Sequence, residues 1–552
     1  MVRKFESTTF WGTSKNRVEA DVIILGCSLP GIVTAHKLKK RFGNTMDIVV
    51  LNLAGPDKKA SKCNVSFQAV SDDEDSDTEE DVTNYDETAR QLLDNVARYY
   101  LSQYAKEFHL PVPDAIIAPF KVRQPLNKLF QHMNGTTVEC ATDFHDFEYL
   151  CLLERFEINQ YQTLLDQSMM ELFQTFSVEE PADRGRLMYY DRTTMEEHIC
   201  GALFFTTSRD IMRMTVRLVC GASADSVSVL FYLHQCYRTS SSRNHLDGNN
   251  TRLREKLLGY CRKRFANRLQ QSVADITFNS KPIKEIRTCS DEQVILETMK
   301  GETTYVCTLL AMALKPDELH NINVDDQLLS QENVKVTNSM LPGRAKKFLV
   351  QYEDNFWEKQ GYSGDILSIR GPILWAMERP KMCGPGSTER YSALVGYLMV
   401  DENDELGSGE KVLDQLVKLF GEEAATPVSY RETDVDDVFI PKCGDFVALR
   451  RLTGKNITSQ YVEWGALDIF AEGDVAAALE AGHTAYIHLL SYLRPQAVTY
   501  EDECTSGWPL FLSDNPLSRW LSNVNLVVGI KWSAYIAATI VTVRLVRSYL
   551  AK

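Results

Sequence analysis

Residues 22–31 read Val-Ile-Ile-Leu-Gly-Cys-Ser-Leu-Pro-Gly, and this stretch decides the fold. The four apolar residues predict a buried parallel strand, and the turn after them has glycine at its first and last positions, Gly26 and Gly31. A helix is predicted over residues 32–42 and a second strand over residues 47–51. A strand, a glycine-containing turn, a helix and another strand are typical of a dinucleotide-binding unit.

Two positions of this unit differ from a working dinucleotide site. The middle residue of a G-x-G-x-x-G turn is a glycine, because the pyrophosphate approaches bare backbone there at the helix N-terminus, and here that residue is Ser28. An acid normally ends the second strand and binds the ribose hydroxyls, and here Asn52 stands in its place. Gly26, Ser28, Gly31 and Asn52 are therefore the candidate cofactor-binding residues, although the motif alone is weak evidence for a cofactor.

Length and composition restrict the class of protein. A chain of 552 residues is too long for one core, so two interleaved domains with extensions are expected. A hydrophobic fraction of 44% is that of a folded globular protein, and the formal charge of -15 argues against a general nucleic-acid binder. The thirteen cysteines contain no C-x-x-C pair, which indicates reduced thiols facing the cytosol, and no metal-binding motif is present.

An apolar run near the C-terminus, residues 524–543, is close to the length that spans a bilayer. It predicts a tail anchor, with the rest of the chain facing the cytosol. Arg544, Arg547 and Lys552 behind a moderately apolar span favour the mitochondrial outer membrane over the endoplasmic reticulum, which is the alternative location. The other interpretation is an amphipathic helix packed on the body, because Lys531 inside the span costs about 2–3 kcal/mol.

Residues 71–81 form a run of acids and hydroxyls that is unable to build a core, so a disordered surface loop is predicted. Ser71, Ser76 and Thr78 each precede acids, a local chemistry favoured by acid-directed kinases, and phosphorylation would deepen the negative charge. The loop either only solubilises the protein or contacts unknown protein partners.

Several segments, taken in order, resemble monoamine oxidase and the wider flavin-containing amine oxidase family. They are similar to the family's flavin-nucleotide turn, its helical substrate domain, the strand with the flavin-proximal lysine, the Phe-Trp segment after that strand, and the closing flavin-binding strand and helix. These segments are residues 21–31, 190–195, 231–236, 341–347, 355–358, 361–364, 468–474 and 478–482. The resemblance implies an α/β fold with α+β insertions, in which a Rossmann-like FAD/NAD(P)-binding domain is interleaved with a monoamine-oxidase-like substrate domain and followed by a C-terminal transmembrane helix.

The expected domain organisation follows from this resemblance. The nucleotide-binding-like domain comprises residues 1–70, 271–340 and 451–495, and the substrate-like domain comprises a mostly helical part, 87–270, and a sheet, 341–450. The remaining segments are the acidic loop 71–86, a linker 496–523 and the anchor 524–543. Residues 191–197 look like the N-cap and first turn of a helix.

The resemblance also implies where a flavin would be held. Lys347 falls where the family has the lysine that holds a water against the flavin ring, although an ordinary strand lysine is the alternative. Cys443 lies close to the cysteine that tethers flavin in monoamine oxidases, although a free structural cysteine fits its neighbours better. Gly473 and Asp474 belong to the closing flavin-binding motif, and Gly444 stands where the first tyrosine of the family's aromatic cage would be.

The departures from the family cluster where flavin would sit. The family's double-glycine-arginine stretch is absent, and residues 54–59 and the acidic loop stand in its place, where carboxylates would repel a diphosphate. The sequence therefore favours a catalytically inactive pseudo-oxidase without cofactor, acting as a scaffold or regulator at the mitochondrial outer membrane. The alternative is an active FAD-dependent amine oxidase that converts amine and O2 to an imine or aldehyde and H2O2 with altered specificity. A third hypothesis keeps a nucleotide only as a structural plug.

Overall fold

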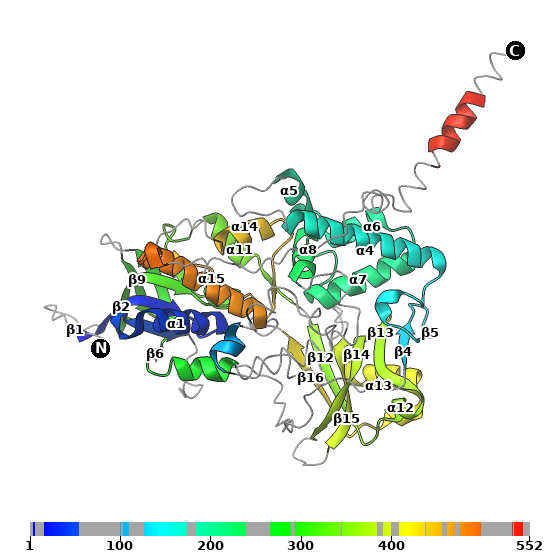
Figure 1. Ribbon diagram of the computed structural model, residues 1–552, viewed down its shortest axis with the longest axis horizontal. Helices are drawn as coiled ribbons and strands as arrows, with labels where there is room; N and C mark the ends of the chain where they lie inside the picture. Colours follow the sequence, from blue (N-terminus) through cyan, green and yellow to red (C-terminus); the bar gives the residue numbers. More distant parts are fainter. Residues whose placement is uncertain are drawn as a thin grey trace. The chain divides into compact units, whose positions relative to one another are not determined.

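The chain forms two compact units, and each is built from separate stretches of sequence. Unit 1 comprises residues 1–120, 253–343 and 435–508, and unit 2 comprises residues 121–252, 344–434 and 509–552. The computed structural model describes residues 4–5, 16–53, 100, 103–109, 126–173, 184–238, 265–288, 293–329, 331–343, 345–383, 390–398, 408–435, 438–454, 461–469, 475–497, 533 and 535–544. Figure 1 shows the elements of these residues.

The centre of unit 1 is a parallel sheet with the order β9-β2-β3-β6. Its strands are β2 (Asn16–Leu25), β3 (Ile48–Asn52), β6 (Thr277–Ser280) and β9 (Thr303–Met312). The predicted apolar strand is the C-terminal half of β2, where residues 22–25 are fully buried. A run that is apolar on both faces suits a parallel strand covered from both sides, so this prediction is confirmed.

Further strands extend this sheet beyond β9. β7 (Ile283–Thr288) and β8 (Val294–Thr298) pair antiparallel, β8 pairs antiparallel with β9, and β10 (Asn323–Val324) joins β7. β18 (Val462–Glu463) pairs parallel with β9, and β1 (Lys4–Phe5) pairs with β2. The strand that closes the sheet is thus β18, which lies before the segment 468–474 that resembled the family's closing strand.

Two long helices cover one face of this sheet, α1 (Leu29–Phe42) and α15 (Val475–Leu493). α1 begins three residues before the predicted helix, because Pro30 has no backbone N–H to leave unpaired in a first turn and its fixed φ suits a helix. Both helices contribute to one core cluster with Val22, Ile24 and Val50, and Figure 1 shows them lying along each other.

The remaining elements of unit 1 are short. They are α10 (Pro316–Leu319), α11 (Gln331–Asn338), α14 (Phe446–Leu452), β11 (Leu341–Pro342) and β17 (Phe439–Ile440). β11 and β17 pair antiparallel, and α11 and α14 pack in a small cluster with Phe439 and Leu467. Residues 265–272 are helical and contribute Phe265 and Leu269 to the core beneath α1.

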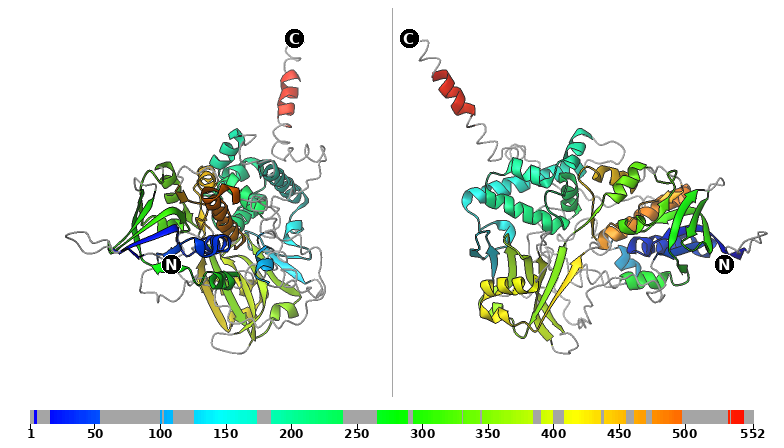
Figure 2. Two further views of the ribbon diagram at one scale, coloured as in Figure 1. Left: turned by 60° about the vertical axis from the view of Figure 1, so that its left-hand side comes forward. Right: turned by 180° about the vertical axis from the view of Figure 1, so that it is seen from behind.

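Unit 2 contains a mixed sheet with the order β16-β12-β15-β14-β13-β4-β5. Its strands are β4 (Asn127–Gln131), β5 (Thr137–Cys140), β12 (Ala345–Tyr352), β13 (Tyr362–Ser368), β14 (Ile373–Cys383), β15 (Arg390–Leu398) and β16 (Ser429–Val435). α12 (Phe356–Lys359) and α13 (Ser408–Phe420) pack on it through a core that includes Phe348, Trp357 and Leu416. Figure 2 shows these helices beside the sheet.

The helical lobe of unit 2 consists of α4 (Leu152–Phe173), α5 (Arg184–Arg192), α6 (Met195–Ala202), α7 (Thr206–Cys220) and α8 (Val229–Arg238). The helix predicted to start at residues 191–197 begins later than expected, because Asp191 and Arg192 still belong to α5 and Thr194 is the N-cap of α6. Its side chain accepts from the Glu197 backbone, and the Glu197 carboxylate accepts from the Thr194 backbone. This reciprocal pair is a capping box.

The expected transmembrane helix at residues 524–543 is wrong. No helix among the described residues combines the length and the apolar character needed to cross a bilayer. Within residues 535–544 the hydroxyls of Thr539 and Thr542 bond backbone carbonyls four residues earlier, so polar side chains interrupt the apolar surface. Residues 524–532, like the acidic loop 71–86, lie outside the described residues. The mitochondrial location was inferred from the span and stays a prediction.

Candidate functional site

Gly26 ends the strand β2 and turns the chain into α1 with φ of +110°. A Cβ atom there would lie 2.0 Å from the carbonyl oxygen of Ala313, the residue that follows β9. The backbone N–H of Gly26 donates to the Leu51 carbonyl at 2.8 Å, which fixes the turn between two strands. Glycine is therefore required here by the backbone conformation and by the packing of the protein itself.

Gly31 has a similar explanation. A Cβ atom at Gly31 would lie 2.7 Å from the Cβ of Ala313 and 3.0 Å from the carbonyl oxygen of Gly26. The first turn of α1 thus passes directly over the end of β9. The third glycine of a dinucleotide motif allows this close approach of helix and strand. Glycine at position 31 is therefore explained by the packing of the protein and is not evidence for a ligand.

A third close approach joins α1 to α15. A Cβ atom at Gly482 would lie 2.6 Å from both the Pro30 carbonyl oxygen and the Val33 Cβ. The Thr34 hydroxyl bonds the Pro30 carbonyl at 2.8 Å and lies 3.1 Å from the Gly482 carbonyl. These contacts hold the helix pair together and leave the turn rigid.

Ser28 occupies the position where a dinucleotide motif keeps its backbone bare. It is the N-cap residue of α1, yet its side chain accepts no hydrogen bond from the helix. Its hydroxyl instead donates to the Ala313 carbonyl oxygen at 2.8 Å. The side chain therefore ties the turn to the end of β9, at the motif position where a working motif leaves the backbone bare for a pyrophosphate.

Asn52 ends β3 beside the turn, where a working motif has its ribose-binding acid. It pairs with Ser280 on β6, and its backbone carbonyl accepts from the Lys281 N–H at 3.1 Å. The side chain is half-buried and neutral. It supplies one amide oxygen where a carboxylate would offer two anionic acceptors to a ribose diol.

Cys443 is half-buried in the turn that precedes α14. Gly444 follows it with φ of +99°, a conformation that favours glycine over a tyrosine. Asp445 accepts from the Ser339 hydroxyl at 2.7 Å and so fastens this turn to the end of α11. Gly473 and Asp474 lie outside the described residues.

Lys347 lies on β12, in unit 2, and is paired with Tyr397 of β15, which is paired in turn with Trp375 of β14. Directly paired residues project on the same side of a sheet, so these three side chains share one face. The rings of Trp375 and Tyr397 stack with centroids 6.0 Å apart. Lys346 projects on the other face, towards Glu432 and Asp434. Lys347 therefore differs from its neighbour in belonging to an aromatic face.

The structure also contains a buried pair that the sequence did not indicate. Glu463 on β18 accepts from the Gly465 N–H at 2.7 Å and pairs with His488 Nδ1 of α15 at 2.8 Å through the same carboxylate oxygen, Oε1. Oε2 has no hydrogen-bond partner within the described part of the chain. Burial raises the pKa of Glu463, and the hydrogen bond from His488 opposes this rise. The two residues are 25 positions apart in the sequence, and neither belongs to a motif.

A second charged group lies on the outer side of α1. Glu107 accepts from His36 Nε2 at 2.6 Å and from Lys40 Nζ at 2.7 Å, and His36 Nδ1 lies 2.7 Å from the Ser272 hydroxyl. Burial favours a raised pKa of Glu107, but the hydrogen bonds from His36 and Lys40 and the charge of Lys37 outweigh it and lower this pKa to about 2. This group joins α1 to two neighbouring helical segments and has a structural role.

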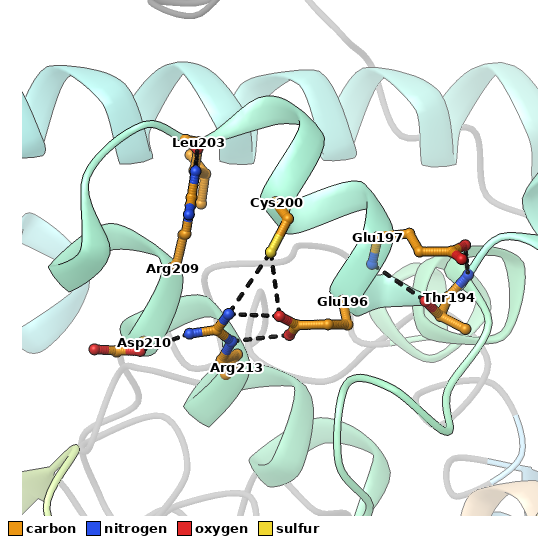
Figure 3. A network of polar contacts seen from close by, with 8 residues as sticks. All are labelled: Thr194, Glu196, Glu197, Cys200, Leu203, Arg209, Asp210 and Arg213. Atoms are coloured by element: carbon orange, nitrogen blue, oxygen red, sulfur yellow. Dashed lines mark hydrogen bonds and ion pairs between the residues drawn. The ribbon is translucent and has the colours of Figure 1, made fainter.

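The polar network of α6 and α7 is also structural (Figure 3). Arg213 donates to both oxygens of Glu196, at 2.8 and 2.5 Å, and to Asp210 at 2.8 Å. Cys200 donates to the same Glu196 carboxylate. Burial, together with the bond to Glu196, raises the pKa of the Cys200 thiol, which keeps it protonated and a poor nucleophile.

The described residues at the turn do not fit tight binding of a flavin dinucleotide. The two glycines that remain, Gly26 and Gly31, are those that packing against Ala313 requires. The position that serves the ligand holds Ser28, whose hydroxyl is already bonded, and the ribose position holds the neutral Asn52. A bound FAD would supply the redox chemistry. What remains for its diphosphate is the N-terminus of α1, whose first helical turn contains no acidic residue.

Comparison with known proteins gives the family. The family model described as flavin containing amine oxidoreductase matches residues 160–456. Amine oxidase [flavin-containing] A of Canis lupus familiaris is 24% identical over 255 residues, which are 44% of this chain and 46% of the relative. Amine oxidase [flavin-containing] B of Homo sapiens is 24% identical over 44% of this chain and 47% of the relative. The matched region thus spans about half the length of these relatives.

Solved structures agree on the fold. A putrescine oxidase redesigned in its cofactor binding superposes with a TM-score of 0.60 and 15% identity, over 86% of this chain and 99% of that one. The cyclohexylamine oxidase from Brevibacterium oxydans gives a TM-score of 0.58 and 17% identity, over 86% and 99%. The resemblance to monoamine oxidase seen in the sequence is confirmed. Because the family model covers more than half of the sequence, the chain belongs to the flavin-containing amine oxidoreductase family.

Proposed function

We propose that this member of the family is a pseudo-oxidase, which binds flavin weakly, does not oxidise amines and acts as a scaffold or regulator through protein contacts. One observation carries the proposal: the packing residues of the turn are present, but the residue at its ligand-facing position is not a glycine. The residues needed to pack α1 against β9 are intact, whereas the residue that would face the dinucleotide, Ser28, bonds to the Ala313 carbonyl.

Charge supports the same conclusion. The diphosphate of a flavin dinucleotide needs cationic donors, and its ribose needs an anionic acceptor. Asn52, at the ribose position, is neutral and supplies no such anion. The acidic residues 71–81 follow β3 in the sequence, and carboxylates held beside a diphosphate would repel it. A basic surface on a partner protein is the ligand that such a segment suits, and phosphorylation of Ser71, Ser76 or Thr78 would strengthen this attraction.

An active FAD-dependent amine oxidase is the second candidate, and one observation favours it. Lys347 shares a sheet face with the stacked rings of Trp375 and Tyr397, an arrangement of a cation beside aromatic surface that the pseudo-oxidase does not require. In that case FAD would carry the redox step, and Lys347 would hold a water molecule. The backbone N–H groups of the α1 N-terminus would have to compensate for Ser28 and Asn52.

The two candidates are separated by the absorption spectrum of the full chain, purified from cells grown with ample riboflavin and then precipitated with acid. The pseudo-oxidase is expected to be folded and colourless, and to release no H2O2 with a panel of primary amines. Flavin bands that move to the supernatant would show non-covalent flavin, and bands that stay with the pellet would point to Cys443. Either of these results, together with H2O2 release that Lys347→Met abolishes, would overturn the pseudo-oxidase.

A further inference from the structure

The first turn of α4 carries an apolar surface that the fold does not cover. Leu152 is 83% exposed, Leu153 59% and Phe156 50%. Successive residues of an α-helix are rotated by about 100°, so these three side chains project on one side of α4. Ile158, Tyr161 and Leu165 project on the other side, into the lobe. Contiguous large apolar side chains of this kind mark an interaction site.

Phe204, in the connection between α6 and α7, extends this surface. Its backbone N–H donates to Glu157 Oε1 at 2.5 Å, which places it beside the first turns of α4. Its ring is 53% exposed, and it meets the Phe205 ring at 5.4 Å. We call Leu152, Leu153, Phe156 and Phe204 the α4 surface.

Acidic residues accompany the α4 surface. Asp146 and Glu148 lie just before the helix, and Glu154 lies within its first turn, where it accepts from the Cys151 N–H at 3.3 Å. Arg155 is the cation among these residues of the helix start. The chemistry therefore suits an occupant that is apolar and followed by positive charge, and it disfavours an anionic lipid surface.

The chain itself contains a segment of this chemistry. Within the helical residues 535–544, Ile536, Ile540 and Val543 form a stripe at helical spacing, and each is at least half exposed. The basic residues Arg544, Arg547 and Lys552 come directly after this stripe. Residues 498–532 connect the helix to the end of α15, and an extended chain of that length spans on the order of 100 Å.

We propose that the C-terminal helix, residues 535–544, folds back onto the α4 surface of the same chain. The stripe of Ile536, Ile540 and Val543 covers Leu152, Leu153 and Phe156, and Arg544 behind the stripe approaches Asp146, Glu148 and Glu154. The contact removes two exposed apolar surfaces from water at once, which is the driving force. It makes this face of the lobe available to a partner only when the segment is released.

Cys151 offers a native reporter for this contact, because its exposed thiol adjoins Leu152. The rate of maleimide labelling at Cys151 is measured by peptide mass spectrometry in the full chain, and Cys200, which is exposed but reacts slowly because of its raised pKa, serves as the internal reference in the same lobe. Ile536→Glu combined with Ile540→Glu is expected to raise the Cys151 rate about tenfold, as for an equilibrium shifted by about 1.4 kcal/mol. The Cys200 rate should not change, which also shows that the lobe is folded.

A matched control places the same charges on the opposite side of the C-terminal helix. Ala538→Glu combined with Thr542→Glu should leave the Cys151 rate within about twofold of the unmodified chain, because these positions lie away from the stripe. Charge is tested separately. Arg544→Glu should raise the rate, and adding Glu148→Arg should lower it again, since the second change restores an opposite-charge pair.

Three results would overturn the proposal. Equal Cys151 rates in the unmodified chain and the Ile536→Glu, Ile540→Glu variant would show that the segment does not cover the surface. Protection that grows with protein concentration would assign the surface to a second copy of the chain. Protection that arises only with added phosphatidylcholine vesicles, and not in their absence, would assign it to lipid.

Discussion

Ser28 donates its hydroxyl to the carbonyl oxygen of Ala313 at 2.8 Å, and this bond joins the turn after β2 to the end of β9. The same alanine limits Gly26 and Gly31, whose missing Cβ atoms would collide with it. One residue outside the motif therefore accounts for three positions inside it. The two glycines of the motif serve the packing of the protein itself, and the Ser28 side chain takes part in the same packing.

Gly26→Ala is expected to destabilise the protein strongly. The added Cβ would lie 2.0 Å from the Ala313 carbonyl oxygen, and φ of +110° is strained for any side chain. The two effects together should cost about 3 kcal/mol or more of the free energy of unfolding. Gly201→Ala in α6 is the control, since nothing lies within 4 Å of its Cβ, and it should stabilise by up to about 1 kcal/mol. Thermal unfolding of both variants checks the contrast, and equal midpoints would contradict it.

Glu107→Gln is expected to remove a contribution to stability that depends on pH. Because the pKa of Glu107 is lowered to about 2 in the folded chain, its carboxylate stabilises the fold above its unfolded pKa near 4.5, and this stabilisation is lost as the pH falls towards 2. With allowance for solvent screening, the difference at pH 7 should be about 1–2 kcal/mol. Urea unfolding from pH 7 to 3 measures it. Glu19→Gln, in an exposed pair with Arg17, is the control and should change stability little.

Glu463→Gln should show the opposite dependence on pH. Burial raises the pKa of Glu463 in the folded chain, so its neutral form stabilises the fold. This contribution to stability is fully present below the unfolded pKa and is lost as the pH rises through the folded pKa. A neutral amide keeps the hydrogen-bond acceptor for Gly465 without the charge. The variant should therefore gain stability relative to the unmodified chain as the pH rises above the unfolded pKa near 4.5. A constant difference in urea midpoints over this range would refute the assignment.

Much of the framework could be predicted from local patterns. The apolar strand at residues 22–25 and the next strand are predicted correctly because a parallel strand buried on both faces leaves a continuous apolar run, whereas the turn is shorter than predicted because α1 begins at Leu29. A helix start was predicted within residues 191–197 because N-cap signals are local, and the structure places it at Thr194, whose capping box with Glu197 acts over three residues. Each of these signals is contained within one short stretch of sequence.

The remainder depended on contacts between distant residues. Ala313 follows Ser28 by nearly three hundred residues, and nothing in the sequence marks it as the residue that requires the two glycines. The pair of Glu463 and His488 joins a short strand to a helix, and neither type of residue indicates burial. The prediction of a membrane-spanning helix at residues 524–543 was wrong because the length of the apolar run was given more weight than the lysine and the hydroxyl groups within it.

Ser28→Gly combined with Asn52→Glu tests whether two side chains account for the weak flavin binding that we propose. The change removes the side chain from the motif position that a working site keeps bare and introduces an acid for the ribose, so the affinity for FAD should rise at least about tenfold, or about 1.4 kcal/mol. Ser28→Ala with the same Asn52→Glu is the matched control. It also loses the bond to Ala313, at a cost of about 1 kcal/mol in stability, but it keeps a Cβ in the turn and should gain less affinity. Quenching of FAD fluorescence by each purified full chain gives the dissociation constants. Equal dissociation constants for the two double variants would show that the missing glycine at position 28 does not limit flavin binding. Tight FAD binding by the unmodified chain would contradict the proposal of weak binding altogether.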